Sequence, residues 1–292
     1  MARSTARARP RQPIYQEVDE REARKVSSRV RTTRAKRRQR VQRRRYAVVY
    51  DIEGPKVRVG ILWFLVAAVA LAIGPLPTAL AYGAVAAVAA RQAARAWRRQ
   101  RMRPNEVVAA VMAGAMTVGA CLGAGGSGVA IVGGVIAALV AATGDVKSPH
   151  HVLADAGWTI QCALFPGLAA MSVVLLARLD QGSAIALLLL VSAYEAGDYI
   201  VGSGASNPYE GPAAGLTAIV VITFIVSTLP ISTLSFGEAW LFGGMVGILA
   251  PLGQLFASAL LPDAASPASA LRRLDSLLLA GPAFCLGVGI VL

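Results

Sequence analysis

Residues 183–202 read SAIALLLLVSAYEAGDYIVG, a stretch in which Glu195 and Asp198 are the only charged side chains. A helix needs about 20 consecutive, mainly apolar residues to cross the hydrocarbon core of a bilayer. This stretch therefore predicts a membrane-spanning helix. Its two carboxylates are unusual, because an ionised side chain inside a span costs about 3 kcal/mol or more unless it is solvated or paired.

The composition of the whole chain agrees with this stretch. Hydrophobic residues make up 55% of the 292 residues and charged residues only 15%, and the mean hydropathy is +0.57. One soluble core could not bury that much apolar surface. The composition favours a polytopic integral membrane protein.

Similar apolar runs occur along most of the chain after residue 58. We place candidate spans at about 59–74, 76–91, 106–123, 127–143, 158–177, 183–202, 213–230, 236–257 and 276–292. The predicted fold is an all-α transmembrane bundle of about nine segments. Pro75 and Pro77 separate the first two short runs, which could instead form one re-entrant hairpin.

The basic residues gather at the N-terminus. Residues 1–58 hold 19 of the 29 Lys and Arg residues and 6 of the 16 Asp and Glu residues, so this segment carries the whole net charge of +13. Its low apolar content predicts a tail that is mostly disordered or partly helical around 17–45. We divide the chain into this tail, an N-terminal transmembrane region (59–184) and a second transmembrane region (185–292).

The basic tail has two possible roles: it sets the orientation of the chain in the membrane, or it contacts the membrane surface. Basic segments stay on the cytoplasmic side of a membrane, so we expect a cytoplasmic N-terminus and insertion in the inner cell membrane. Attraction to anionic lipid headgroups is the alternative role. No nucleic acid is expected as a partner, because base-stacking aromatic residues are not interleaved with the arginines.

Glycine patterns predict where helices approach and where they end. Gly119-x-x-x-Gly123 and Gly243-x-x-x-Gly247 have the spacing that permits close helix packing in membranes. Gly125-Gly126-Ser127-Gly128 predicts a turn on the outer side that breaks the helix.

Glu195 and Asp198 lie three residues apart, so a helix places them on one face. Two carboxylates on one face could hold a divalent cation through their oxygens. The alternative is a pair of carboxylates solvated at the helix end. The sequence contains no nucleotide-binding P-loop and no Cys/His metal motif.

Four short stretches with recognisable motifs follow one another in the last part of the chain. They are Glu195–Gly202, Ser206–Gly211, Leu241–Ser258 and Arg272–Leu278. The first resembles the D-x-x-A-Y-x-x-G segment of phosphatidate cytidylyltransferase, also called CDP-diacylglycerol synthase, and the second is similar to a shortened form of its S-P-K-K-T-x-E-G loop. The third resembles its G-x-x-x-x-x-G-D-L-x-x-S stretch and the last its closing D-R-L-D-S-L signature. The resemblance begins near residue 185 and covers a little over a third of the chain.

The resemblance implies a magnesium-dependent enzyme that converts CTP and phosphatidic acid into CDP-diacylglycerol for phospholipid biosynthesis. The residues present in this chain would form a rearranged version of the family's site. Its expected catalytic carboxylates are Asp275, Asp198 and Glu195, and its expected magnesium ligands are Asp275, Asp263 and Glu195. The expected phosphate-binding residues are Arg272, Arg273 and Ser258.

The chain departs from the family pattern where the family binds cations and triphosphate. Gln254 replaces the Asp of G-D-L, Leu261-Pro262 replaces a Lys-Arg pair, and Arg272 replaces the first Asp of the closing signature. An amide is a weaker ligand than a carboxylate for a hard cation, and a guanidinium group repels one.

These departures leave three functions open. The first is the family's nucleotidyl transfer, and the second is a non-catalytic relative that acts as a lipid-binding or regulatory membrane subunit. The third and weaker one is a transporter, since carboxylates in membrane helices also mark ion pathways. Membrane lipids are the expected partners, and a homodimer is left open.

Overall fold

The computed structural model describes residues 56–100, 102–144, 149–203, 207, 209–229, 231–263 and 266–292. These residues form helices and short connections and contain no strand. The all-helical prediction is therefore confirmed for the described part of the chain. The predicted tail, apart from its last three residues, lies outside the described residues, as do Ser206 and Pro208 of the second family-like stretch.

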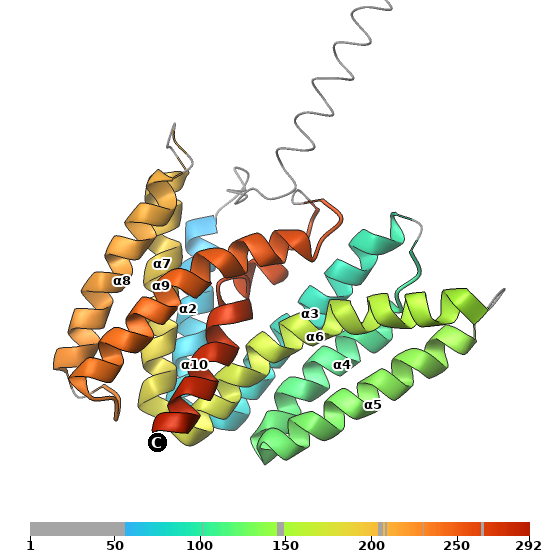
Figure 1. The fold of residues 1–292 in the computed structure, drawn as a ribbon, viewed down its shortest axis with the longest axis horizontal. Helices are drawn as coiled ribbons and strands as arrows, with labels where there is room; N and C mark the ends of the chain where they lie inside the picture. The colour runs from blue at the N-terminus through green and yellow to red at the C-terminus, as the bar shows by residue number, and fades with distance from the viewer. Residues whose placement is uncertain are drawn as a thin grey trace, which may run out of the picture. The chain divides into compact units, whose positions relative to one another are not determined.

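The described chain contains nine α-helices (Figure 1) and two short 3-10 helices. They are α2 (Lys56–Ile73), α3 (Pro75–Arg98), α4 (Glu106–Gly119), η1 (Ala120–Leu122), α5 (Ala124–Thr143), α6 (Pro149–Leu179), α7 (Gln181–Gly202), α8 (Glu210–Thr228), α9 (Phe236–Ala259), η2 (Leu271–Arg273) and α10 (Leu277–Val291). Each of the nine predicted apolar segments coincides with one of these α-helices.

Five helices are long and apolar enough to cross a membrane. They are α5, α6 from Val152 onward, α7, α8 and α9. Three further apolar helices are shorter, namely Arg58–Ile73, Glu106–Leu122 and Leu277–Val291. The structure thus supports a membrane-type helical protein with five candidate spans, and the count of nine crossings stays a prediction.

Local hydrogen bonds fix where three of the helices begin. The Asn105 side chain accepts bonds from the backbone N–H groups of Val107 and Val108, both at 3.0 Å, at the start of α4. Asp180 accepts a 2.7 Å bond from Ser183 N–H at the start of α7, and α9 begins with a capping box of Ser235 and Glu238. Such caps satisfy backbone donors that a helix leaves unpaired.

The turn predicted at the glycine run is wrong. α5 begins at Ala124, so the run is helical, and the chain turns at Gly123, whose φ of 91° suits glycine. Gly126 within the run permits close helix packing, because a Cβ on Gly119 of α4 would lie only 2.7 Å from the carbonyl oxygen of Gly126 in α5. The close packing predicted at Gly119 is confirmed.

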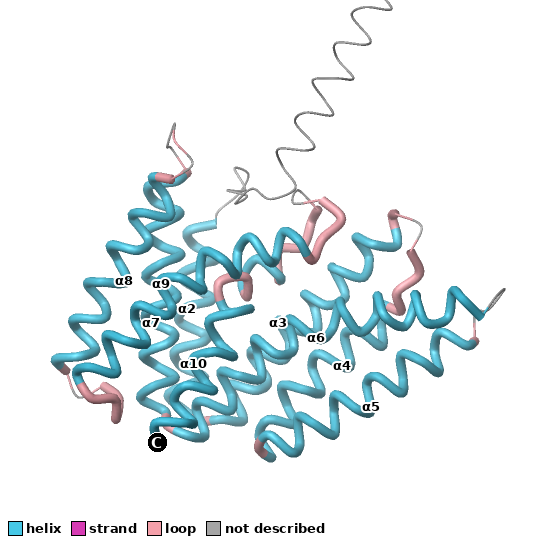
Figure 2. The backbone as a smooth tube through the Cα atoms, in the orientation of Figure 1, coloured by secondary structure: helices cyan, strands magenta, loops and turns pink. Residues whose placement is uncertain are grey.

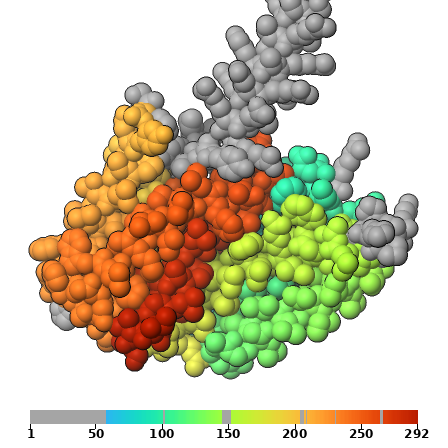
Figure 3. All heavy atoms as spheres, in the orientation of Figure 1, coloured from blue at the N-terminus to red at the C-terminus, as the bar shows by residue number. Residues whose placement is uncertain are grey.

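α6 is the central helix of the bundle, in contact with α3, α4, α5, α7 and α10. Figure 2 shows the helices joined by loops. On the face seen in Figure 3, α8, α9, α10, α6 and α5 follow one another across the surface, and each neighbouring pair in this series is in contact.

One end of the bundle gathers the starts of α4 and α6 and the last turns of α3 and α9. The Trp97 indole N–H donates to the Leu260 carbonyl at 2.8 Å, and the Trp97 and Trp158 rings lie 4.1 Å apart. Arg95 of α3 contacts Glu106 of α4 at 2.6 Å. We call this end of the bundle the site end, because the candidate functional site described below lies there.

The turn between α6 and α7 ties other elements together at the far end. The Gln181 amide donates to the Leu71 carbonyl at 2.6 Å, near the end of α2. The Arg178 guanidinium donates to the carbonyls of Ala120 and Cys121 in η1. The ends of α2, α4 and α6 therefore lie together, opposite the site end.

Candidate functional site

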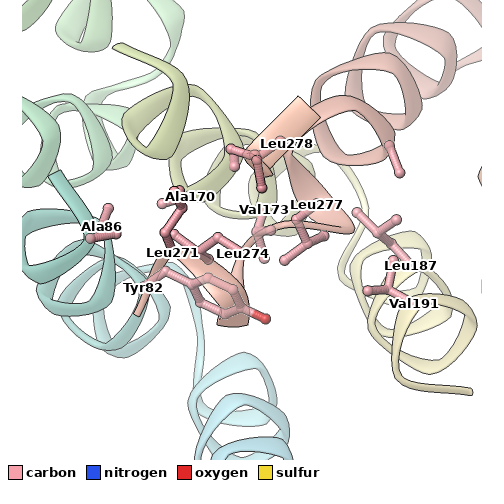
Figure 4. Packing of buried hydrophobic residues seen from close by; sticks show 14 of the residues in the cluster. Tyr82, Ala86, Ala170, Val173, Leu187, Val191, Leu271, Leu274, Leu277 and Leu278 are labelled. Carbon is pink, nitrogen blue, oxygen red and sulfur yellow. The ribbon is translucent and has the colours of Figure 1, made fainter. Parts of the chain in front are cut away.

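The segment that follows α9 is anchored in the core of the bundle. Leu271 and Leu274 are both fully buried, and Figure 4 shows them beside Tyr82 of α3 and close to Ala170 and Val173 of α6. Burial of two leucines stabilises the position of the segment by about 3–6 kcal/mol. The polar residues between and after them are therefore held by an apolar anchor.

A glycine lets this segment lie directly against α9. A Cβ on Gly253 would overlap the backbone carbonyl of Asp275. Because only glycine leaves room for that carbonyl, the closing signature reaches the C-terminal half of α9, where Gln254 and Ser258 are located.

Asp198 of α7 is buried and bound to α9. The Gln254 side-chain N–H donates to Asp198 Oδ2 at 3.3 Å, and the Tyr194 hydroxyl donates to Gln254 Oε1 at 3.4 Å. Only 3% of Asp198 is exposed, so the alternative of two carboxylates solvated at the helix end does not hold for this residue.

Arg272 links α9 to the signature segment. Its Nη1 donates to Ser258 Oγ at 3.1 Å and lies 3.9 Å from Asp275 Oδ2. The backbone N–H of Ser276 donates to the other Asp275 oxygen at 2.8 Å. Burial raises the pKa of Asp275 to about 6 despite the nearby Arg272 charge, and burial lowers the pKa of Arg272.

Glu195 and Arg273 complete the group. Glu195 lies near the Ser276 side chain and interacts electrostatically with Asp275, Arg273 and Asp198. The structure thus brings together six of the seven residues predicted for the site. Those six residues are Glu195, Asp198, Ser258, Arg272, Arg273 and Asp275.

Asp263 is the seventh predicted residue. It lies in the loop after α9, where its carbonyl accepts a 2.9 Å bond from Ser266 N–H. Its assignment as a metal ligand stays a prediction of the sequence.

Two contributions from the N-terminal half were not predicted. Tyr82 of α3 is 1% exposed and interacts electrostatically with Glu195. A Cβ on Gly60 of α2 would lie 3.5 Å from Arg273 Nη1. Neither residue belongs to a motif. Each lies more than a hundred positions in the sequence from the site residue that it approaches, so only the tertiary structure reveals its proximity to the site.

The donors around the carboxylates do not fit a bound magnesium ion. The Gln254 amide N–H faces Asp198, and the Arg272 guanidinium faces Asp275. Within the described ranges, no three His, Cys, Asp or Glu side chains are grouped closely enough to hold a metal ion. A hard cation needs several oxygen ligands, whereas Gln254 donates to one oxygen of Asp198 and the Arg272 charge lies 3.9 Å from one oxygen of Asp275.

Comparison with known proteins identifies the family. The model of the Cytidylyltransferase family matches residues 55–261, which include Glu195, Asp198, Gln254 and Ser258. The match extends the resemblance from residue 185 back to α2 and ends before η2. None of the curated proteins matches the chain.

The family model matches more than half of the chain, which shows that the chain belongs to the family. The apolar helices suggest a membrane protein. This chain belongs to the cytidylyltransferase family, the family of phosphatidate cytidylyltransferase.

Proposed function

We propose that the chain is a non-catalytic, lipid-binding membrane protein built on the cytidylyltransferase fold. The observation that carries this proposal is the pairing of Asp198 with the Gln254 amide and of Asp275 with Arg272. Nucleotidyl transfer needs cations that neutralise the triphosphate and the departing pyrophosphate. The carboxylates that would hold such cations are bound to internal donors in this chain.

Arg272, Arg273 and Ser258 are the proposed contacts for a lipid phosphate. A guanidinium group presents a planar set of N–H donors that matches phosphate oxygens. Arg272 and Arg273 are both partly exposed, and they lie at the end of membrane-type helices. A phosphate monoester lipid such as phosphatidic acid is the ligand class that suits this position.

Catalysis is the second candidate function. The convergence of Glu195, Asp198 and Asp275 favours it, because these carboxylates come from separate parts of the chain and meet at one place. In that case CTP and phosphatidic acid would be the substrates, with magnesium as cofactor and CDP-diacylglycerol as product.

An activity assay separates the two functions. The purified full chain, reconstituted in phosphatidylcholine vesicles, is incubated with CTP, magnesium and phosphatidic acid. We expect neither CDP-diacylglycerol nor pyrophosphate. Formation of both products, with loss of activity in Asp275→Asn, would overturn the proposal and establish the enzyme.

A binding assay tests the lipid-binding part. Short-chain phosphatidic acid is titrated against the chain in detergent, with short-chain phosphatidylcholine as the comparison. Loss of a charge-assisted hydrogen bond predicts about tenfold weaker binding of phosphatidic acid in Arg273→Ala. Arg99→Ala removes an exposed arginine outside the site and should leave binding unchanged. Equal affinity of the wild type for both lipids would contradict lipid-phosphate binding.

A further inference from the structure

The exposed face of α3 changes from apolar to basic along its length. Its exposed residues recur at helical spacing, beginning with Leu80 and Val88, which are 59% and 48% exposed. The same face then continues with Arg91, Arg95 and Arg98, whose side chains are 53%, 51% and 58% exposed. Residues three or four apart share one face of a helix. We call these three residues the arginine stripe.

Among the described residues, the carboxylate of Glu106 faces the arginine stripe. Glu106 at the start of α4 lies 3.6 Å from Arg91, 2.6 Å from Arg95 and 3.2 Å from Arg98. The three guanidinium groups therefore share one negative charge, and the stripe keeps a formal surplus of two positive charges. Ion pairs whose guanidinium groups are half exposed are weak and are screened by salt, so a stronger anionic ligand can compete with Glu106.

The neighbouring apolar surface indicates the kind of anion. Val107 and Val111 on α4, the helix that begins beside the arginine stripe, are 66% and 64% exposed, so both α3 and α4 carry exposed apolar side chains. A ligand that covers this surface needs an anionic head and apolar chains. An acidic protein segment or a nucleic acid would satisfy the arginines but not the valines.

We propose that the arginine stripe and Glu106 form a binding site for an anionic phospholipid. The lipid phosphate lies against Arg91, Arg95 and Arg98, and its acyl chains run along the exposed apolar part of α3 toward Leu80. Glu106 limits the affinity by holding part of the positive charge. This site is separate from the group around Asp198 and Asp275, and it exists whether or not the chain transfers nucleotides.

Variants that change the charge of the arginine stripe test the site. The full chain is purified in detergent, and binding of dioleoyl phosphatidylglycerol and dioleoyl phosphatidylcholine is measured by native mass spectrometry. One basic residue near a lipid surface contributes about 1 kcal/mol, which corresponds to about a fivefold change in affinity. Arg95→Gln should therefore weaken phosphatidylglycerol binding about fivefold, whereas Glu106→Gln should strengthen it by a similar factor.

The double variant distinguishes a binding role from a purely structural one. Arg95→Gln with Glu106→Gln restores the original surplus of charge, so we expect an affinity close to that of the wild type. Losses in both single variants would overturn the proposal, because they would indicate damage to the α3–α4 contact. Equal binding of phosphatidylglycerol and phosphatidylcholine would also overturn it. So would equally tight binding of heparin, a soluble polyanion.

Discussion

Asp275 illustrates how the bundle changes the chemistry of one side chain. It is 7% exposed, lies 3.9 Å from the Arg272 guanidinium and accepts hydrogen bonds from Ser276. Burial outweighs these favourable contacts, since it raises the pKa of Asp275 to about 6. A free aspartate has a pKa of about 3.9, so the folded chain holds this proton more tightly than the unfolded chain.

This raised pKa predicts a pH-dependent effect of Asp275→Asn. A group with a raised pKa in the folded state contributes stability below its unfolded pKa, and that contribution is lost as the pH rises through the folded value. The wild type should therefore lose stability relative to the variant between about pH 4 and pH 6. We expect Asp275→Asn to raise the thermal unfolding midpoint in detergent at pH 7.5 and not at pH 4.

The wild type, unfolded in parallel at both pH values, serves as the reference. A lower unfolding midpoint for Asp275→Asn at pH 7.5 would contradict the prediction, because it would mean that the ionised carboxylate stabilises the fold.

Two adjacent glycines of α9 show how closely α9 packs against α8. A Cβ on Gly243 would overlap the Thr223 side chain of α8, whereas a Cβ on Gly244 would meet no atom within 4 Å. Thr223 Oγ1 is buried, and within the described chain it has no hydrogen-bond partner. The contact at Gly243 therefore depends on close packing, as expected from the Gly243-x-x-x-Gly247 spacing.

This difference predicts opposite outcomes for two matched substitutions. Gly243→Ala should destabilise the protein by about 1–3 kcal/mol, because an added methyl group overpacks the α8–α9 contact. Gly244→Ala should be neutral or stabilising by up to about 1 kcal/mol, because alanine favours a helix over glycine. Unfolding in denaturant, followed by helical circular dichroism, compares the two. Equal destabilisation would refute the assigned packing.

The helix ends define two opposite poles of the described bundle. The α2–α3 turn lies at the far end, since Gln181 donates to Leu71 and the Cys121 thiol contacts the Pro75 carbonyl at 3.7 Å. The last turn of α3 lies at the site end, where Trp97 contacts Leu260. α2 and α3 thus run between the two poles, and two membrane crossings by these helices stay a prediction.

Thiol labelling of intact cells tests this topology. In a background without Cys121, Cys162 and Cys285, single cysteines replace Leu76 near the α2–α3 turn and Gln100 after α3. A membrane-impermeant reagent should label Leu76→Cys from the outside and Gln100→Cys only after the cells are opened. Gly237→Cys at the start of α9 is the far-end reference. Protection of Leu76→Cys while Gly237→Cys is labelled would instead indicate a re-entrant hairpin.

The sequence by itself determined the helices and most members of the site. The apolar segments are local features, because a run of suitable length forms a helix whatever it packs against. Asp198, Ser258, Arg272 and Asp275 were also identifiable, since their order along the chain resembles a family pattern.

Only the tertiary structure decided what these side chains bind. The bond from Gln254 to Asp198 joins α7 to α9, and the arrangement of Arg91, Arg95 and Arg98 around Glu106 joins α3 to α4. The sequence predicts a turn at residues 125–128, because only the contact between helices shows that Gly126 packs against Gly119. Hydropathy and motifs are properties of single segments and predict helices and candidate residues. The pairing, burial and charge balance of side chains depend on which segments are in contact.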